Sequence, residues 1–330
     1  MQRISLQQAL TAVPHVSIVQ WRASSWLVRW LISARASVLV MTFSVAALGG
    51  LLAQFSAVQF DGLAWLGCLI GLLLAHAANN QLNDLTDSAR GIDEGNYFRT
   101  RYGAHVLEDG LLSRKALWRY IGITGGLALL IGLWLVARVG GAVMAPLVLG
   151  GLFLVFYTWP LKHWGLGELA VLLVWGPLMT GGAYLVSTGN WSWKVAVVGT
   201  VFALGPTTVI FGKHIDKLPF DQAKGVATLP VRLGAHASLL AVRIMTILQY
   251  VATVALVIIG SLPWPVLAIA LALPKAWRMV HVYSQDAPSE CPPEFPETAW
   301  PLWYVAFAFD HTRAFGLLFL LGLCAGVLLD

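Results

Sequence analysis

Long apolar stretches, separated by short polar segments, recur along most of this chain and leave few possible folds. Each stretch approaches the roughly 20 residues that a helix needs to cross a lipid bilayer. An unpaired backbone group has no partner in lipid, so these stretches must be helical. The stretch at 263–282 is the weakest, because Pro263, Pro265 and Pro274 interrupt it. We predict an all-α, polytopic membrane protein with about nine transmembrane helices, at residues 37–56, 62–78, 117–137, 141–158, 168–187, 194–212, 238–260, 263–282 and 306–329.

The overall composition excludes other classes of protein. Charged residues make up only 11% of the 330 residues, whereas a soluble domain has about 25%. The net charge of +5 does not indicate a nucleic-acid partner, because the basic residues lie in short loops between apolar stretches. Cys68, Cys291 and Cys324 are far apart in the sequence, which favours neither a disulfide framework nor a zinc site. Arg29 interrupts the first short apolar run, so we predict no cleavable signal peptide.

A first acidic cluster follows the second apolar stretch, which we expect to continue as a helix beyond the bilayer edge. On such a helix Asn80, Asp84 and Asp87 share one face, and Asn83 lies one turn before Asp87. Amide and carboxylate oxygens suit Mg²⁺. His76, one turn deeper, is predicted to be a hydrogen-bonded interior histidine rather than a ligand. Basic residues downstream can bind phosphate oxygens: Arg90, Arg99 and Arg101. The alternative is a polar helix end followed by a solvated loop.

A second acidic cluster follows the sixth apolar stretch. Asp216 and Asp221 can supply further metal ligands, and the lysines between and beside them suit a diphosphate: Lys213, Lys217 and Lys224. The alternative is a mixed-charge loop held by internal ion pairs. Carboxylates at the edge of a bilayer need a charged or metal partner. The two clusters together therefore predict one site for metal ions and a polyanion.

The basic residues predict the orientation of the helices. If the N-terminus is cytoplasmic, only Arg138 and Lys194 of the 21 basic residues lie outside, which satisfies the positive-inside rule. Both acidic clusters then lie on the cytoplasmic side of the cell (inner) membrane, and the active site opens toward the cytoplasm. We expect a cytoplasmic or interfacial segment at 1–36 and a membrane domain at 37–330, capped by the loops 83–115 and 213–236. The proline-rich stretch 284–297 is expected to be irregular.

Several blocks of sequence resemble the UbiA superfamily of intramembrane prenyltransferases. Asn80, Asp84 and Asp87 fit its first motif, Asn-x-x-x-Asp-x-x-(x)-Asp. The run from Asn80 to Asp93, and the blocks at 157–177 and 225–234, are most similar to the branch that prenylates dihydroxynaphthoate on the way to menaquinone. The second motif of the family, Asp-x-x-x-Asp, has three residues between its aspartates. Asp216 and Asp221 have four residues between them. Asp221 keeps the family's distance to the glycine and threonine that follow it.

The resemblance implies a bundle of nine helices around a central cavity, with Mg²⁺ bridging the acidic motifs to a prenyl diphosphate. The implied reaction transfers the prenyl group to an aromatic acceptor, 1,4-dihydroxy-2-naphthoate, at the lipid bilayer. Aromatic side chains can stabilise the allylic cation, and Tyr157 is the one expected to be catalytic. The other catalytic residues are expected to be Asp84, Asp87 and Asp221. The expected metal ligands are Asn80, Asp84, Asp87, Asp216 and Asp221, and the diphosphate ligands are Asn80, Asn83, Arg90, Arg99, Arg101, Lys162, Lys213, Lys217 and Lys224.

Three other functions fit parts of the sequence. A terpene cyclase of the same superfamily needs the same diphosphate site, so the acidic motifs do not separate it from a transferase. A prenyltransferase with another aromatic acceptor is equally compatible with them. A transporter or lipid-binding protein is less compatible, because the polar groups gather at one membrane face and the sequence shows no pair of broken helices in matching positions.

Overall fold

The computed structural model describes residues 3–11, 13, 15–56, 59–95, 98, 101 and 103–329. Its regular elements within these ranges are all helical, and no described residue is in a strand. Nine helical runs of the described chain are long and apolar enough to cross a membrane. They confirm every predicted span and differ from the predictions only at their ends: Ala36–Phe55, Gly62–Ala89, Arg114–Val139, Gly141–Trp164, Gly167–Thr188, Trp193–Asp216, Ala235–Ile258, Trp264–Val282 and Trp303–Leu329.

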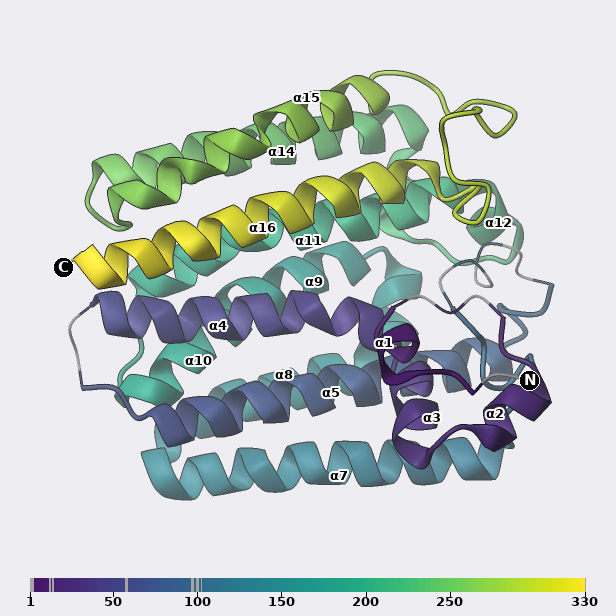
Figure 1. Cartoon of the computed structure of the whole chain (residues 1–330), viewed down its shortest axis with the longest axis horizontal. Coiled ribbons are helices and arrows are strands. Elements are labelled where there is room, and N and C mark those ends of the chain that lie inside the picture. Colours follow the sequence, from purple (N-terminus) through teal and green to yellow (C-terminus); the bar gives the residue numbers. More distant parts are fainter. Residues whose placement is uncertain are drawn as a thin grey trace.

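Most of the spans are single long helices that lie side by side (Figure 1). The first consists of a short 3₁₀ turn, η1 (Ala36–Val38), and α4 (Leu39–Phe55). The continuous helices are α5 (Gly62–Ala89), α7 (Arg114–Val139), α11 (Trp193–Asp216), α14 (Ala235–Ile258) and α16 (Trp303–Leu329). Helix α5 extends past residue 78, which confirms that the second span continues as a helix through the first acidic cluster.

The fourth and fifth spans are both interrupted, which the sequence analysis did not expect. In the fourth, η2 (Gly141–Val143) and α8 (Met144–Phe156) precede η3 (Tyr157–Leu161) and η4 (Lys162–Trp164). Trp159 has extended φ and ψ inside η3, because a residue before proline is driven out of the helical region. The fifth consists of α9 (Gly167–Leu173), η5 (Val174–Leu178) and α10 (Met179–Thr188), and it is broken before its proline at Gly176.

The proline-rich eighth span is helical, as predicted. It consists of η6 (Trp264–Ala272) and α15 (Leu273–Val282). Pro265 and Pro274 each lie in the first turn of a helix, where a missing N–H costs no hydrogen bond. Helix α16 packs closely on η6 because Gly322 has no side chain: a Cβ there would lie 2.6 Å from the Val266 Cα.

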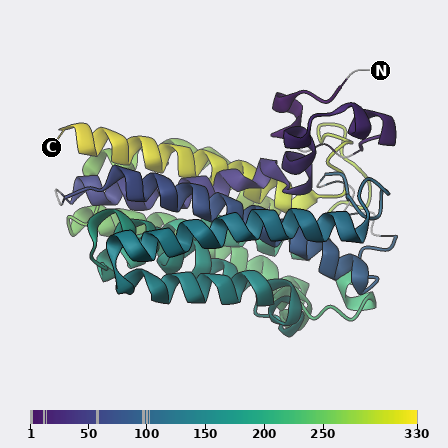
Figure 2. The same ribbon diagram turned by 90° about the horizontal axis from the view of Figure 1, so that it is seen from below.

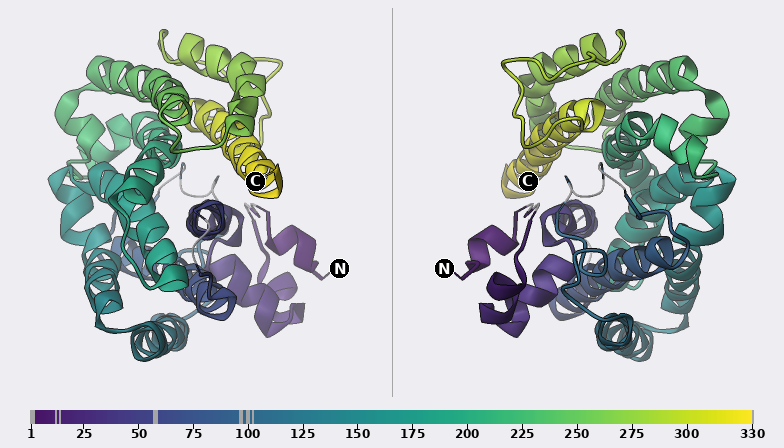
Figure 3. Two further views of the ribbon diagram at one scale, coloured as in Figure 1. Left: turned by 90° about the vertical axis from the view of Figure 1, so that its left-hand side faces the viewer. Right: turned by 90° about the vertical axis from the view of Figure 1, so that its right-hand side faces the viewer.

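Helix α11 is the most enclosed of the nine candidate spans. The main apolar core surrounds it and joins side chains of α4, such as Leu48, to Phe202 of α11 and Phe319 of α16. Phe202 and Phe319 stack edge to face with ring centroids 5.3 Å apart. The end-on views show the helices arranged around the middle of the bundle (Figure 3).

The polar segments lie at one end of the bundle, which we call the loop end. It carries residues 90–95, 98, 101, 103–113 and 217–234. The second of these segments includes α12 (Leu218–Ala223) and α13 (Leu229–Leu233). The N-terminal helices α1 (Leu6–Ala9), α2 (Ile18–Ala23) and α3 (Trp26–Ser33) lie beside the bundle at this end (Figures 2 and 3). Val16 and Leu31 of this N-terminal part belong to the same apolar cluster as Val106 of the first loop. Residues 284–297 contain no helix, as predicted.

Candidate active site

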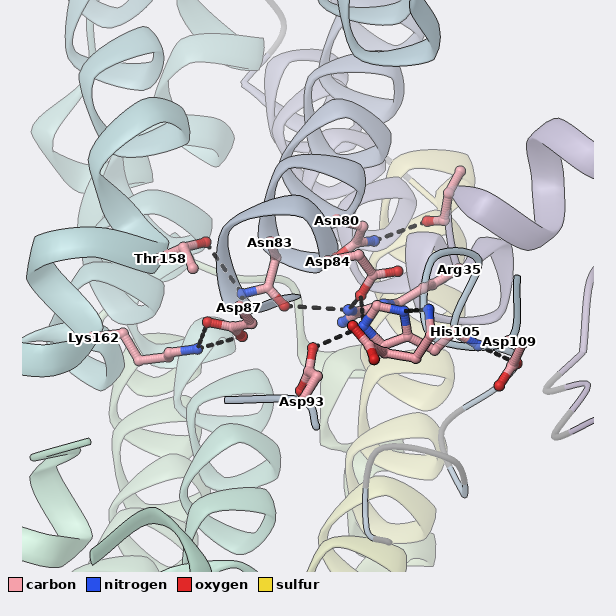
Figure 4. A network of polar contacts seen from close by, with 12 residues as sticks. Arg35, Asn80, Asn83, Asp84, Asp87, Asp93, His105, Asp109, Thr158 and Lys162 are labelled. Carbon is pink, nitrogen blue, oxygen red and sulfur yellow. Dashed lines mark hydrogen bonds and ion pairs between the residues drawn. The ribbon is translucent and has the colours of Figure 1, made fainter. Parts of the chain in front are cut away.

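Helix α5 places the residues of the first acidic cluster on one side at the loop end (Figure 4). Asn80, Asp84 and Asp87 are each buried, with Asp84 only 1% exposed. Asn80 donates a hydrogen bond from Nδ2 to the Ala34 carbonyl at 2.9 Å, which ties α5 to the end of α3. Buried carboxylates are costly unless a cation or several donors compensate them, so the partners of the two aspartates are informative.

The carboxylate of Asp84 is paired with the guanidinium of Arg35 (Figure 4). Nη2 of Arg35 also donates to Oδ1 of Asn83 at 3.2 Å. Arg35 precedes α4 and has a φ of 53°, in the left-handed region that residues other than glycine rarely adopt. This backbone turn brings the start of the first span over the acidic face of α5. Arg35 is not among the residues predicted for the site from the sequence.

The carboxylate of Asp87 is paired with Lys162. Nζ of Lys162 lies 2.9 Å from Oδ1 and 2.7 Å from Oδ2, and both side chains are buried. Asn83 donates from Nδ2 to Oδ2 of Asp87 at 3.2 Å and to Oγ1 of Thr158 at 3.1 Å. Thr158 and Lys162 both reach α5 because the fourth span breaks between them, at Trp159.

The first loop returns to the same place. Nε2 of His105 lies 2.8 Å from Oδ2 of Asp93 and 3.9 Å from Oδ1 of Asp84. The three residues are buried and offer ligand atoms within 4.8 Å of one another, which is a donor set that can hold a metal ion. The backbone N–H of Ala104 donates to the Val13 carbonyl at 2.7 Å, so the N-terminal segment holds this loop in place. No sequence spacing pointed to His105.

The two carboxylates of the second cluster have different surroundings. Asp216 accepts backbone hydrogen bonds from Tyr304 at 2.9 Å and Val305 at 3.0 Å, and so caps the first turn of α16. Asp221 is 1% exposed, and its Oδ1 lies 3.1 Å from Nζ of Lys217. Oδ2 of Asp221 is buried and has no hydrogen-bond partner among the described residues.

The two loops meet. Nζ of Lys224 donates to the carbonyls of Gly91 at 3.0 Å and Glu94 at 3.3 Å. The rings of Phe98 and Phe220 also lie next to each other, with centroids 6.4 Å apart. The structure thus brings together the segments that carry the two acidic clusters. These carbonyls hold Lys224 at the surface. The sequence had predicted that Lys224 lies beside the acidic groups of the second cluster.

A cavity of about 1040 Å³ joins this polar cluster to the interior of the bundle. Asp87 and Cys68, at opposite ends of α5, both line it, so it extends for roughly 28 Å at 1.5 Å per residue. Its wall is mostly apolar away from the loop end. The predicted site residues that line it are Asn80, Asn83, Asp87, Arg101, Tyr157, Lys162, Lys213 and Lys217.

The predicted site residues that do not line the cavity are Asp84, Arg90, Asp216, Asp221 and Lys224. The guanidinium of Arg90 lies over the ring of Trp159, 4.5 Å from its centroid. Arg99 lies outside the described residues. Nδ1 of the predicted interior histidine, His76, is 2.8 Å from Oγ1 of Thr42, which confirms its hydrogen bond. His76 also lines the cavity.

A buried histidine–glutamate pair lies next to the cavity and was missed by the sequence analysis. Nδ1 of His214 lies 2.5 Å from Oε1 of Glu168. Oε2 of Glu168 accepts the backbone N–H of Leu229 at 3.4 Å, at the start of α13. His214 lines the cavity. The pair fixes the start of the fifth span against α11 and the second loop.

These features define an all-helical membrane protein whose apolar cavity ends in a cluster of carboxylates and lysines. The model of the UbiA prenyltransferase family matches residues 39–303, and the chain belongs to this family. The fold resembles that of a UbiA homolog from Archaeoglobus fulgidus bound to GPP and Mg²⁺, with a TM-score of 0.54 and 14% identity, over 85% of this chain and 99% of that one.

Two curated relatives are similar to this chain at low sequence identity. The UbiA prenyltransferase domain-containing protein 1 of Xenopus tropicalis is 26% identical over 207 residues, which cover 62% of this chain and 59% of that protein's length. The 1,4-dihydroxy-2-naphthoate octaprenyltransferase of Haemophilus influenzae is 25% identical over 277 residues, which cover 80% of this chain and 88% of that protein.

Proposed function

We propose that this protein transfers a prenyl group from a polyprenyl diphosphate to an aromatic acceptor, 1,4-dihydroxy-2-naphthoate, in quinone biosynthesis. The observation that carries the proposal is one cavity that joins Asp87, Lys162 and Lys217 to a long apolar interior. Such a cavity suits a donor with a charged head and an apolar tail. The dihydroxynaphthoate prenyltransferase among its relatives supports the acceptor.

Mg²⁺ is the proposed cofactor. Oδ2 of Asp221 has no hydrogen-bond partner among the described residues, and Asp84 lies in a buried group of possible metal ligands with Asp93 and His105. These carboxylate oxygens are hard donors, which fit this ion. The proposed metal ligands are Asn80, Asp84, Asp87, Asp216 and Asp221. When bound, Mg²⁺ neutralises the negative charge that develops on a departing diphosphate. The A. fulgidus homolog binds GPP and Mg²⁺, which supports both the cofactor and the class of donor.

The residues of the chain then act on the donor as follows. Lys162, Lys213 and Lys217 line the cavity and are placed to bind the diphosphate while the C1–O bond breaks. The diphosphate leaves with the bonding electron pair, and an electron-rich carbon of the acceptor forms the new bond to C1. The ring then loses the proton of the carbon that was prenylated. The naphthoate also loses its carboxylate as CO₂, and a proton takes its place on the ring. Tyr157 faces the same cavity, and its ring is a candidate to stabilise the allylic cation.

The proposed site opens toward the cytoplasm from the cell (inner) membrane, as the distribution of basic residues predicts. The first test is an assay in detergent with geranylgeranyl diphosphate, Mg²⁺ and 1,4-dihydroxy-2-naphthoate, followed by mass spectrometry. A prenylated, decarboxylated naphthoquinol is the expected product. A terpene alcohol or hydrocarbon formed without acceptor would instead identify a cyclase, and diphosphate release with another ring would change the acceptor. No diphosphate release with any donor would overturn the proposal.

A further inference from the structure

His76 lies on the side of α5 that faces the cavity, deeper in the bundle than the first acidic cluster. His76, Asn80, Asn83 and Asp87 all line the cavity, at spacings that place them on one face of the helix. At 1.5 Å per residue, His76 is roughly 10 Å farther from the loop end than Asn83. The α5 residues that line the cavity still deeper are apolar: Cys68, Gly71, Leu72 and Ala75. The polar wall that begins at Asp87 therefore ends on α5 at His76.

The hydrogen bonds of Thr42 on α4 determine which ring nitrogen of His76 carries the proton. Oγ1 of Thr42 accepts a hydrogen bond from Nε1 of Trp175 at 3.2 Å and lies 2.8 Å from Nδ1 of His76. An indole N–H can only donate. Among the described residues, Nδ1 of His76 is the hydrogen-bond acceptor that remains for the hydroxyl proton of Thr42. Because Nδ1 accepts this proton in a hydrogen bond, the ring carries its own proton on Nε2.

The Nε2–H of His76 is thus a hydrogen-bond donor directed at the cavity. Nδ1 is turned toward Thr42, which does not line the cavity, whereas the ring of His76 does. No described residue accepts a hydrogen bond from Nε2. A donor without a partner in an apolar wall costs free energy, so this N–H is suited to an oxygen atom of a bound molecule.

Trp175 of η5 makes this part of the wall suitable for an aromatic ring. It lines the cavity, and its ring meets the ring of His76 edge to face, with centroids 5.7 Å apart. Aromatic side chains favour stacked or edge-to-face contacts with other rings. A prenyl chain has no oxygen to accept a hydrogen bond, and the diphosphate has the lysines of the loop end as partners. The N–H of His76 beside Trp175 therefore fits a ring that carries an oxygen, which is the chemistry of the acceptor.

We propose that the Nε2–H of His76 donates a hydrogen bond to a ring oxygen of the aromatic acceptor and holds the acceptor against Trp175. The proposal rests on the proposed function and deepens it, because it names the contact that selects an oxygen-bearing ring. In 1,4-dihydroxy-2-naphthoate either hydroxyl oxygen can accept this hydrogen bond. Thr42 is then a positioning residue, since its hydroxyl keeps the proton of His76 on Nε2.

The test measures KM for 1,4-dihydroxy-2-naphthoate and for geranylgeranyl diphosphate in wild type and His76→Phe. The phenyl ring can keep the contact with Trp175 but has no N–H, so KM for the naphthoate should rise about fivefold or more while KM for the diphosphate stays unchanged. His76→Gln keeps a side-chain N–H and should lose less. An unchanged naphthoate KM in folded His76→Phe, or an equal rise in both KM values, would overturn the proposal.

His311→Phe is the matched control. His311 is buried in α16, its Nε2 lies 3.1 Å from the hydroxyl of Tyr250, and it does not line the cavity. The same substitution there should leave KM for the naphthoate unchanged. Thr42→Val should raise this KM even though Thr42 does not line the cavity, because the proton of His76 is then no longer held on Nε2. A rise with His311→Phe as large as that with His76→Phe would contradict a specific contact.

Acceptor analogues identify the oxygen that His76 contacts. 1-Hydroxy-2-naphthoate and 4-hydroxy-2-naphthoate each lack one of the two hydroxyl groups, and both are used as competitive inhibitors. The analogue without the contacted oxygen should have the same Ki for wild type and His76→Phe, whereas the other analogue should bind the variant more weakly. The same response of both analogues to the substitution would overturn the proposal.

Equilibrium binding of radiolabelled 1,4-dihydroxy-2-naphthoate separates this proposal from the proposed function. Wild type that binds the naphthoate without forming a product, together with weaker binding by His76→Phe, would refute the proposed function alone. Wild type that prenylates the naphthoate, together with unchanged binding by His76→Phe, would refute the contact of His76 alone. No binding of the naphthoate by wild type would overturn both.

Discussion

The two acidic clusters at the loop end are stabilised in different ways. In the first, Asp84 and Asp87 each pair with a cation from a distant part of the chain, Arg35 and Lys162. In the second, Asp221 pairs with Lys217 one helical turn away and keeps one buried oxygen that has no hydrogen-bond partner among the residues that the structure describes. Both clusters therefore have a cation beside each of these carboxylates, but within the described part of the chain Oδ2 of Asp221 accepts no hydrogen bond and can take a further cation.

This difference suggests how one site can accept both metal and diphosphate. A metal ion that binds the carboxylates of the first cluster competes with Arg35 and Lys162. The diphosphate is negatively charged, so it can pair with these two side chains once the metal ion has displaced them. At the second cluster no such exchange is needed for Oδ2 of Asp221. We therefore expect substitution of Asp84, Asp87 or Asp221 to alter both stability and activity, because each removes the carboxylate from an ion pair.

The largest effect is expected for Asp221→Asn. Asp221 is a proposed ligand of the metal ion that would neutralise the departing diphosphate. Weakening that ligand should lower turnover at least about 100-fold, since a single stabilising group at such a site contributes about 3 kcal/mol. The melting temperature should fall as well, because the variant leaves the buried Lys217 without the charge of its carboxylate partner. Steady-state diphosphate release and thermal unfolding in detergent provide the two measurements. Normal turnover in this variant would remove Asp221 from the site.

Lys162→Met should also destabilise the fold. It leaves the buried carboxylate of Asp87 without its cation, and breaking a buried pair from one side costs about 3–5 kcal/mol. The double variant Lys162→Met, Asp87→Asn is the control, and it should recover much of the lost melting temperature because no buried charge remains. If the single variant melts like wild type, the pair does not compensate Asp87 in the way the structure indicates.

Asp216→Ala tests whether the second cluster has one functional carboxylate or two. Losing the cap of α16 should cost about 1 kcal/mol of unfolding free energy. If Asp216 only caps the helix, turnover at a temperature where the variant is folded should stay within a few-fold of wild type. A loss as large as that of Asp221→Asn would instead support Asp216 as a metal ligand.

The smallest effect is expected for Asp61, which lies at the other end of the bundle. It forms an exposed ion pair, in contrast to the buried pairs of the loop end. Its hydrogen bond from Arg138 holds the pKa of Asp61 below its usual value of 3.8. The stabilisation is present above pH 3.8 and is lost as the pH falls through the lowered folded pKa. Exposed pairs contribute little, so Asp61→Asn should lower the melting temperature only slightly at neutral pH, and this difference should vanish in strong acid. An equal difference at both pH values would contradict the assignment.

The sequence predicts the spans well because each depends on local composition. The apolar run at 62–78, and the polar residues that follow on the same helical face, are enough to place Asp84 and Asp87 on α5. The partners of these aspartates were not predictable in the same way. Arg35 lies 49 residues from Asp84, and Lys162 lies 75 residues from Asp87.

Residues whose position depends on tertiary packing were likewise missed or left open. The cap that Asp216 forms requires the backbone of Tyr304, 88 residues away. His214 and Glu168 meet across 46 residues, with no shared motif to connect them. The breaks in the fourth and fifth spans follow from prolines that are visible in the sequence. Even so, a proline within an apolar run does not indicate whether the helix kinks or opens.

The most direct test of the central claim is diphosphate release from geranylgeranyl diphosphate, measured with the acceptor present, for wild type, Asp84→Ala and Asp221→Ala. We expect release by wild type to need Mg²⁺, to stop with a chelator and to return when Mg²⁺ is restored. Both variants should lose the release of diphosphate, since the two clusters are proposed to form one site. Wild-type turnover in either variant, or release by wild type that a chelator does not affect, would contradict it.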